Sequence, residues 1–574
     1  MEHIKGISAS RGIAKGKVHL EELKELEEIE EKKIDKSKID EEVESLEKAI
    51  EKAKEELKDI KEKTEEEVGK EEAEIFGAHL MFLDDPEFTG TMKEKIKDES
   101  FAAETAVTKV MQKYVVMFEN MDNEYMKARK TDIEDVSRRI IDKLQGEEAK
   151  GSEFADNTVV IAKDLTPSMT ASLDKDKIAA FVTAVGSRTS HTAIMSRSLG
   201  IPAIVGAGGE ILNAVKEGDK VIVDGSSGEL IVNPDQETLK EYDKKIAEYK
   251  EKLALLEKYK DKKAKTKDGE EIEVAGNIGN TADVRGVLEN GGEGIGLFRT
   301  EFLYMDRDNL PNEDEQFEVY KEVAEKMEDK PIIIRTLDVG GDKDIPYLDL
   351  AEEMNPFLGY RAIRLCLDRK EDIFKPQLKA ILRASNYGNI KMMYPFVSSF
   401  EEVIEANKVL EEAKAELDEK DIEYDKEMEV GIMIETPAAV MIADKLAKEV
   451  DFFSIGTNDL IQYTTAVDRT NEKISELHNP YHPGVLKLIK EAIDKAHKND
   501  IWIGMCGAAA GNPLLLPYLL GAGLDEFSMS PASIPELKKK LENWTGEEAK
   551  EVVDKALAMK TSAEVKDYFE QISE

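Results

Sequence analysis

The sequence predicts a multidomain α/β protein, and three observations lead to this fold class. The chain has 574 residues, too many for one hydrophobic core, so several domains are expected. Residues 21–145 have the apolar spacing of helices, whereas residues 266–574 repeat an apolar strand and a helical stretch eight times. The expected fold is a small α/β domain with an inserted all-helical subdomain, a linker helix and a C-terminal (β/α)8 TIM-like barrel.

Composition limits the partners and the compartment. The chain is 41% hydrophobic and 35% charged, as in globular proteins, and its net charge of −41 disfavours nucleic acid and anionic membranes. Basic proteins remain possible partners. The two cysteines, Cys366 and Cys506, suggest no disulfide framework and favour a reducing cytoplasm. No segment approaches the roughly 18 apolar residues of a membrane span, so we expect no membrane insertion.

The first predicted domain combines two separate segments, residues 1–20 and 146–234. Residues 1–20 look like short strands interrupted by glycines. The second segment contains strand-like TVVIAKDL and IAAFVTAV, and VIVDGSSGELIVNP suggests two strands around a Gly-Ser turn. We expect the strands of the two segments to pair, which makes residues 21–145 an insertion.

The insertion is predicted to be entirely helical. Residues 21–60 hold 17 acidic residues and 9 lysines without any Gly or Pro. Such charge either forms a solvated face or docks a basic protein. Further helices are expected near 71–83, 87–97, 101–120 and 132–145. The apolar side of the first helix repeats at intervals of three and four residues, at Val43, Leu46, Ile50, Ala53, Leu57 and Ile60.

A charged linker helix is predicted for residues 235–265, and the barrel is predicted for residues 266–574. The C-terminal ends of the strands of such a barrel meet at one mouth, where the active site lies. Polar residues at those ends should therefore converge. The expected strands are IEVAGN, GIGLF, PIIIRTL, IKMMYP, VGIMIE, FFSIG, IWIGMC and DEFSMS.

The strand ends carry the chemistry of an anion site. Several arginines suit a small anion with carboxylate and phosphate groups, because the guanidinium fork matches their oxygens. Structural ion pairs at a barrel rim are the alternative for any one of them. The residues at the strand ends are Asn277, Arg299, Glu301, Arg335, Asp338, Glu435, Asn458, Asp459 and Cys506.

Two carboxylates and one thiol in this set suggest a reaction type. Glu435 and Asp459 are hard oxygen ligands that suit Mg²⁺, which takes one or two protein carboxylates and completes its shell with water and substrate. These residues predict a metal-assisted phosphoryl or enolate site. Cys506 either donates a proton to a carbanion or is a buried, inert cysteine.

His191 is one of only seven histidines and lies in GSRTSHTAIMSRSLGIPAIVG. Ser190 is the expected N-cap of a helix that begins at His191 and ends at Gly200. A helix N-terminus attracts phosphate, so His191 is either a structural residue or one that becomes phosphorylated. Three neighbours could hold further phosphate oxygens, namely Arg188, Thr189 and Thr192.

The segment around His191 resembles the phosphohistidine motif of enzyme I of the phosphoenolpyruvate-dependent sugar phosphotransferase system. DLTPS at 164–168 and AHLMFLDDPEF at 78–88 match that family as well. The resemblance covers nearly the whole chain. The barrel motifs follow in the order of the family and are GIGLFRTEFLY, IIIRTLDVGGDK, NPFLGYRAIR, GIMIETPAA, FFSIGTNDLIQY and IGMCG.

This resemblance implies phosphoryl transfer from phosphoenolpyruvate to His191 and then to the carrier protein HPr, with release of pyruvate, as the first step of sugar uptake. The first domain then becomes a phosphohistidine domain, the helical insertion binds HPr, and the barrel binds phosphoenolpyruvate and forms a homodimer. Cys506 matches the proton donor to the enolate, and Glu435 with Asp459 matches the Mg²⁺ ligands. The matched phosphoenolpyruvate ligands are Arg299, Arg335, Asn458, Asp459 and Arg469.

The sequence departs from the family after Cys506. The family usually continues with Gly-Glu and then Gly-Asp, but this chain reads MCGAAAGN, with Ala508 and Asn512 at those places. Two acidic groups near the expected donor are therefore missing, which affects protonation more than binding. Two alternatives stay open: a phosphoenolpyruvate-sensing scaffold with weakened catalysis, and a dikinase or synthase relative without the ATP domain.

Overall fold

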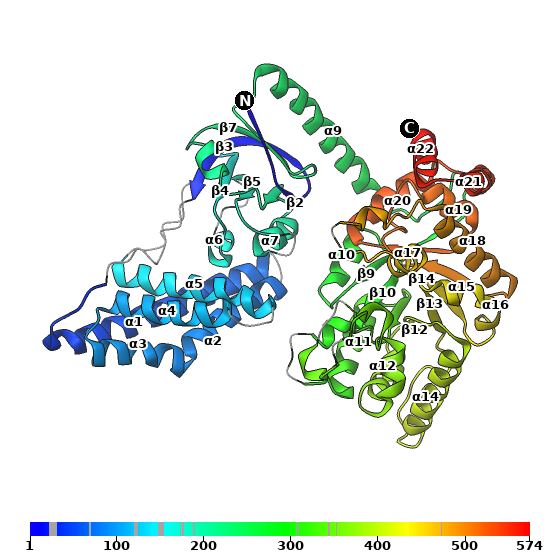
Figure 1. Cartoon of the computed structure of the whole chain (residues 1–574), viewed down its shortest axis with the longest axis horizontal. Coiled ribbons are helices and arrows are strands. Elements are labelled where there is room, and N and C mark those ends of the chain that lie inside the picture. Colours follow the sequence, from blue (N-terminus) through cyan, green and yellow to red (C-terminus); the bar gives the residue numbers. More distant parts are fainter. Residues whose placement is uncertain are drawn as a thin grey trace. The chain divides into compact units, whose positions relative to one another are not determined.

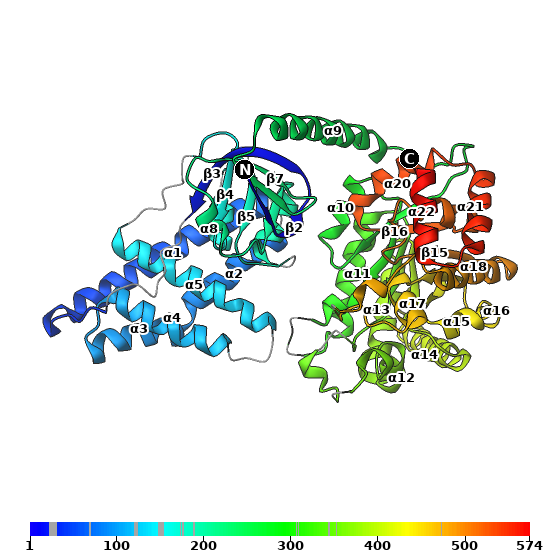
Figure 2. The same ribbon diagram turned by 45° about the horizontal axis from the view of Figure 1, so that its top comes forward.

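The computed structural model divides the chain into two compact units, Met1–Lys252 and Leu253–Glu574, which Figures 1 and 2 show from two directions. No helix in the described part of the chain is long and apolar enough to cross a bilayer. The structure describes all residues except 22–30, 68–69, 120–123, 147–153, 173, 175–176, 188–189, 306, 308, 342–344, 352, 472 and 574.

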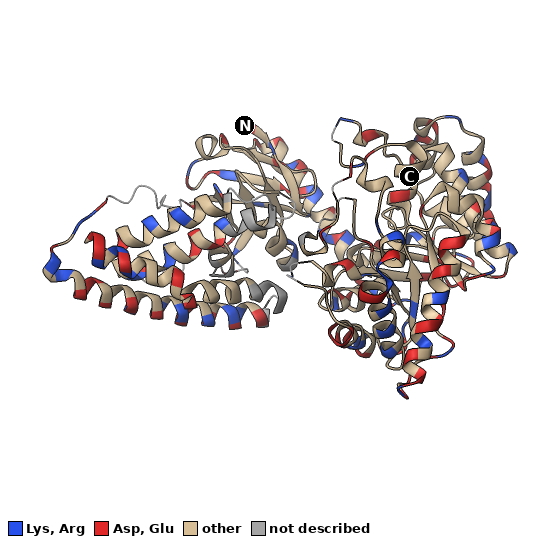
Figure 3. Cartoon of the chain, turned by 60° about the horizontal axis from the view of Figure 1, so that its bottom comes forward, with Lys and Arg blue, Asp and Glu red and all other residues tan. Residues whose placement is uncertain are grey.

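Within the first unit, the insertion is helical, as predicted. The apolar repeat of α1 is the buried side of the helix, with Leu46, Ala53 and Leu57 fully covered. Asp85 caps α3 and Pro86 is its first residue, which explains the break before it. Figure 3 shows acidic and basic residues interspersed along these helices. The helices are α1 (Ile39–Glu67), α2 (Lys70–Asp84), α3 (Pro86–Glu99), α4 (Ala103–Glu119) and α5 (Glu124–Gln145).

The rest of this unit is an eight-stranded sheet of order β1-β8-β7-β3-β4-β5-β6-β2. The N-terminal strands pair with strands that follow the insertion, since β3 lies between β7 and β4. The predicted insertion topology is therefore confirmed. The strands are β1 (Glu2–Lys5), β2 (Ile7–Ser10), β3 (Ile13–Glu21), β4 (Thr158–Ala162), β5 (Ile178–Thr183), β6 (Ala203–Val205), β7 (Lys220–Asp224) and β8 (Glu229–Val232).

Three short helices accompany this sheet, namely α6 (Pro167–Ser172), α7 (His191–Leu199) and α8 (Ile211–Ala214). The sequence did not predict α6, α8 or β6. They are too short to display a periodic apolar pattern. The charged stretch after the sheet forms α9 (Gln236–Lys260), and the division between the two compact units falls inside this helix. The domain boundaries given above stay predictions.

In the second unit, all eight predicted strands close a parallel barrel in the order β10-β11-β12-β13-β14-β15-β16-β9. Alternate residues of the strands face the enclosing helices or the barrel interior, and the interior cluster includes Phe452 and Cys506. The strands are β9 (Glu273–Ile278), β10 (Ile295–Arg299), β11 (Ile332–Arg335), β12 (Ile390–Tyr394), β13 (Val430–Ile434), β14 (Phe452–Ile455), β15 (Trp502–Met505) and β16 (Glu526–Met529).

Helices and short turns cover the outside of the barrel, and three C-terminal helices complete the unit. The helices are α10 (Asp283–Glu289), α11 (Glu313–Met327), α12 (Ile363–Asp368), α13 (Lys375–Ser385), α14 (Phe400–Asp418), α15 (Pro437–Met441), α16 (Ala443–Leu446), α17 (Thr457–Thr465), α18 (Pro483–Lys498), α19 (Leu516–Ala522), α20 (Ile534–Leu541), α21 (Gly546–Ala558) and α22 (Ser562–Ser573).

Candidate active site

His191 is the first residue of α7, as the sequence predicted. Ser190 precedes it with extended backbone, and Gly200 ends the helix with a left-handed φ of 67°. The Ser190 hydroxyl donates to the carbonyl of Ser187 at 2.9 Å and makes no cap hydrogen bond. The Ser190 side chain thus leaves the first turn of α7 uncapped, which suits a helix end that receives an anion.

The surroundings of His191 keep its ring neutral. The residue is partly buried, and Thr170 Oγ1 on α6 lies 3.2 Å from its Nε2. Burial lowers the pKa of His191 to about 4, against the opposing effect of the carboxylates of Asp135 and Asp132. At neutral pH the ring therefore has the lone pair that a nucleophile needs.

Of the three neighbours expected to hold phosphate oxygens, the structure describes only Thr192. Thr192 is buried, and its hydroxyl donates to the carbonyl of Leu165 at 3.4 Å. A hydroxyl that was not predicted, that of Thr170, lies next to the ring. Arg188 and Thr189 lie outside the described residues. The DLTPS motif marked the α6 segment but gave no reason to select Thr170.

At the mouth of the barrel, two buried arginines bind a group of carboxylates. Arg335 Nη2 donates to both carboxylate oxygens of Glu301 at 3.0 Å, and its Nη1 lies 2.9 Å from Asp338 Oδ2. Arg361 Nη2 donates to Asp338 Oδ1 at 2.8 Å and lies 3.5 Å from Asp459 Oδ2. Asp338 thus joins the two guanidinium groups in one network.

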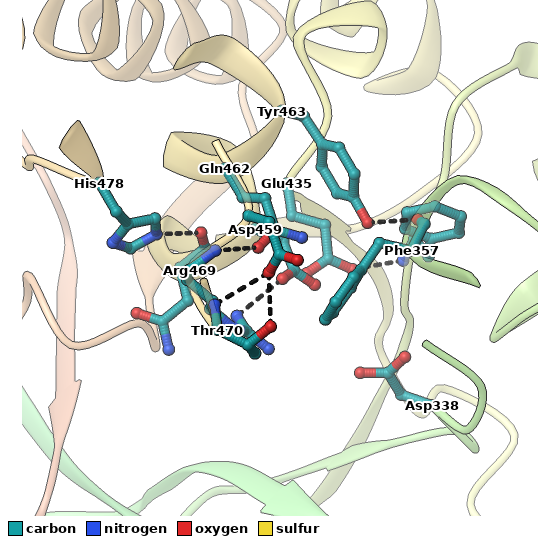
Figure 4. A network of polar contacts seen from close by, with 12 residues as sticks. Asp338, Phe357, Glu435, Asp459, Gln462, Tyr463, Arg469, Thr470 and His478 are labelled. Atoms are coloured by element: carbon teal, nitrogen blue, oxygen red, sulfur yellow. Dashed lines mark hydrogen bonds and ion pairs between the residues drawn. The ribbon is translucent and has the colours of Figure 1, made fainter. Parts of the chain in front are cut away.

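The network continues through two strand ends that Figure 4 shows side by side. Arg469 Nη1 donates to Asp459 Oδ1 at 2.8 Å, and the backbone N–H of Phe396 donates to Glu435 Oε1 at 2.5 Å. Burial and the carboxylates of Asp459 and Asp338 together raise the pKa of Glu435 to about 8, against the opposing effect of Arg335 and Arg361. A bound cation would relieve this crowding of buried carboxylates.

Two predicted ligands, Arg299 and Asn458, lie at the exposed rim. Arg299 is the last residue of β10 and stands over the ring of Phe302 at 5.2 Å. Asn458 is the second residue of α17, and its carbonyl accepts a hydrogen bond from His478 Nε2 at 2.8 Å. Both side chains are solvent-exposed, so they can meet a ligand that enters from outside.

Cys506 follows β15 directly and is 4% exposed. Its Sγ lies 3.9 Å from the carbonyl of Ile455. Its own carbonyl accepts a hydrogen bond of 2.9 Å from Asn277, which lies within β9 rather than after it. Burial raises the pKa of Cys506 to about 12. The side chain is therefore a thiol at neutral pH and holds a proton that it can donate.

The structure brings together most of the predicted barrel residues and adds one that the sequence argument missed. Arg335, Glu435, Asp459 and Arg469 share one network. Arg361, 1% exposed, is at its centre. It lies in the NPFLGYRAIR motif but follows a 3-10 turn, Pro356–Leu358, rather than a strand, so the strand-end rule could not select it.

Three family descriptions match successive parts of the chain. "PEP-utilising enzyme, N-terminal" matches residues 5–129, and "PEP-utilising enzyme, mobile domain" matches residues 154–228. "PEP-utilising enzyme, PEP-binding domain" matches residues 253–545. The last match contains the whole arginine and carboxylate network, and the second contains His191.

Curated relatives match along the entire chain. A phosphoenolpyruvate-protein phosphotransferase of Priestia megaterium is 49% identical over 565 residues, which is 98% of this chain and 98% of that protein. The protein of the same name from Bacillus subtilis (strain 168) is 50% identical over 569 residues, again 98% of each. A solution structure titled as enzyme I (nEIt) is 46% identical, covers 43% of this chain and 99% of its own, and has a TM-score of 0.37.

Proposed function

Because this chain belongs to the enzyme I family of phosphoenolpyruvate-protein phosphotransferases, we propose which of its residues perform each step. The chain transfers the phosphoryl group of phosphoenolpyruvate to a histidine of its own and then to HPr. We assign this histidine to His191. The observation that carries the assignment is its neutral ring at the first turn of α7, beside the hydroxyl of Thr170. A neutral imidazole can attack phosphorus, and the helix N-terminus favours the charge that results.

Phosphoenolpyruvate binds at the barrel mouth in this proposal. Its carboxylate and phosphate need several positive groups, and bidentate guanidinium groups recognise both. Arg361 extends the predicted ligand set, because its guanidinium is fixed by Asp338 at 2.8 Å and faces Asp459. The proposed substrate ligands are Arg299, Arg335, Arg361, Asn458, Asp459 and Arg469.

Glu435 and Asp459 fit a Mg²⁺ ion, since both are buried carboxylates in one network and the pKa of Glu435 is raised by burial and by its acidic neighbours. Among the described residues, no three His, Cys, Asp or Glu side chains are arranged to hold a metal by themselves. Water and substrate would supply the other ligands, as is usual for Mg²⁺. The ion would neutralise charge on the phosphoryl group and on the enolate oxygen.

Cys506 completes the reaction by protonating carbon. When the bond between phosphorus and the bridging oxygen breaks, its electrons remain on the enolate of pyruvate. The methylene carbon of the enolate takes the proton of the Cys506 thiol, and the sulfur is left as a thiolate. Because burial raises the pKa of Cys506 to about 12, the thiol keeps its proton until the enolate forms.

HPr docks on the helical insertion in this proposal. Residues 21–60 hold 17 acidic residues against 9 lysines, an excess that complements a basic partner. Large apolar side chains also face solvent there, at Met81 of α2 and at Val116 and Met117 of α4. A Met81→Glu substitution should weaken HPr binding and leave labelling by phosphoenolpyruvate unchanged.

Two further assignments stay predictions. The barrel is expected to form a homodimer, which sedimentation velocity of the full chain would test. A cytoplasmic location is expected from the cysteine content and the partners.

The scaffold alternative differs from the main proposal only in pyruvate release. Steady-state pyruvate formation with HPr and a sugar acceptor separates the two.

The deciding experiment labels the full chain with ³²P-phosphoenolpyruvate and Mg²⁺ and maps the acid-labile phosphate. We expect the label on His191 and none in a His191→Ala variant. Chelation should prevent labelling, and Asp459→Ala should slow it by orders of magnitude, because the charge of the moving group is no longer neutralised. Asp468→Ala is the matched control, since that carboxylate is exposed and bonds Thr470. Label on another residue would refute the assignment.

A further inference from the structure

One buried carboxyl group in the barrel has no role in the steps above. Glu526 of β16 is 1% exposed, and within the described residues neither of its carboxylate oxygens has a hydrogen-bond partner. Burial raises the pKa of Glu526 well above its usual range, and the nearby carboxylate of Glu273 adds to this rise, which Lys391 opposes. Burial therefore favours the protonated, neutral form of Glu526.

Two glycines make room for this carboxyl group inside the barrel. A Cβ atom built on Gly296 would lie 1.9 Å from Glu526 Oε1, and one built on Gly504 would lie 2.1 Å from Oε2. Any side chain at either position would displace the carboxyl group. The interior at this level is thus shaped around Glu526, although an apolar side chain would avoid the cost of burying an acid.

Strand register brings Glu526 to the layer directly below Cys506. Ser454 of β14 pairs with Gly504 of β15, which pairs with Glu526 of β16. Trp502 and Cys506 face the barrel interior, so Gly504 between them does as well. Since Gly504 has no side chain, β15 places nothing between Ser454 and Glu526 in this layer. Cys506 lies one layer nearer the mouth.

Glu526 acts on the Cys506 thiol from that layer. Burial raises the pKa of Cys506 most. Arg335 lowers this pKa, and Glu526 and Glu435 raise it. A thiolate left after proton donation is therefore a strong base. The loop after Cys506 contains no acid before Asp525, so it cannot return the proton.

Glu526 also reaches the opposite end of the barrel. A small cavity there is lined by Glu273, Pro331, Ile333, Lys391, Trp502 and Glu526. Glu273 is exposed to solvent, and it is close enough to raise the pKa of Glu526. A proton can therefore enter from the end remote from the mouth, where substrate does not block the path.

We infer that Glu526 reloads Cys506 with a proton after each turnover. The inference rests on the proposed role of Cys506. The Cys506 thiolate takes the proton of the Glu526 carboxyl group, which lies against Gly504, two residues before Cys506. Glu526 is left as a carboxylate, which regains a proton from water by way of Glu273. Glu526 thus acts through Cys506 and does not touch the substrate.

The test measures exchange of the methyl hydrogens of pyruvate in D₂O by NMR, with the full chain and Mg²⁺. For each methyl hydrogen that is exchanged, Cys506 must first act as a thiolate and must then receive a new hydrogen from solvent. Glu526→Gln removes the exchangeable acid at equal size and should slow exchange at least tenfold, the lower range of general acid–base effects. Single-turnover labelling of His191 should stay at the parental rate, because it needs no proton on carbon.

Two comparisons separate proton supply from packing. Glu526→Asp keeps the acid but fills the site less well. If Glu526 supplies protons, exchange should be faster in Glu526→Asp than in Glu526→Gln. If Glu526 matters only for packing, the order should be reversed. Glu429→Gln is the matched control, because that carboxyl group is at the same end of the barrel but is held by Lys391 and Trp502. Exchange of the pyruvate methyl hydrogens should proceed at the parental rate in this variant.

Parental exchange in Glu526→Gln, or exchange in Gln at least as fast as in Asp, overturns the inference. A Cys506→Ala variant run in parallel locates the failure. If Cys506→Ala also exchanges at the parental rate, the donor assignment itself is wrong. If only Glu526→Gln does, the donor stands and the reloading path is refuted.

Discussion

Arg361 gives the sharpest test of the barrel site, and we expect Arg361→Met to lose both stability and substrate binding. The guanidinium bonds Asp338 at 2.8 Å and faces Asp459 at 3.5 Å. A hydrogen bond to a charged group contributes about 1.5–3 kcal/mol. Because Asp338 keeps Arg335 and Asp459 keeps Arg469, neither carboxylate becomes an unpaired buried charge. We therefore expect a loss of about 3 kcal/mol, below the upper range of about 3–5 kcal/mol for a broken buried pair.

The assay for stability is urea unfolding followed by tryptophan fluorescence. The chain has two tryptophans, Trp502 and Trp544, and both belong to the barrel unit. The signal therefore reports the barrel alone. Calorimetry with phosphoenolpyruvate and Mg²⁺ measures binding, and loss of one charged contact should weaken the affinity at least about tenfold.

Arg364 provides the matched control. Its guanidinium and that of Arg361 both stand 4.8 Å from the ring of Phe396, but Arg364 bonds the carbonyls of Leu358 and Gly359. Arg364→Met should lose less than about 1 kcal/mol and bind normally. If Arg361→Met binds phosphoenolpyruvate like the parent, the extended ligand set is wrong. If the two variants are equally stable, the energetic argument from the network is wrong.

The remaining predictions concern the two reacting side chains. His191→Ala should abolish phosphotransfer but leave calorimetric binding of phosphoenolpyruvate unchanged, because all proposed ligands lie in the barrel. Cys506→Ala should still label His191 in a single turnover, while entry of solvent hydrogen into pyruvate slows strongly. NMR titration should place the His191 midpoint near 4. Since this pKa is below the unfolded value of about 6.5, the first unit should lose up to about 3 kcal/mol as pH falls from 6.5 to 4. Unchanged stability over that range in circular dichroism melts would contradict the buried, neutral state of His191.

Long periodic segments and strand-end residues could be predicted from the sequence because each depends on local order. The 3-4 spacing on α1 selects one buried side whatever it packs against. The barrel strands were recognisable as short apolar stretches, and Arg335, Glu435, Asp459 and Cys506 followed from their places after them. The helix that begins at His191 followed from Ser190 and Gly200, whose preferences are local as well.

Only the tertiary structure decided which side chains meet. Arg361 follows no strand, and Thr170 belongs to a helix too short to show a periodic pattern. The sequence does not distinguish Glu526 from other acidic residues in strands, because its contacts with Gly296 and Gly504 exist only in the folded barrel. Each depends on contacts between segments far apart in the chain. The pKa of His191 depends on burial and on carboxylates of α5, and that of Glu526 depends on burial inside a closed barrel. Sequence fixes the types of these groups, but desolvation and neighbouring charge, which set their protonation, exist only once the chain has folded.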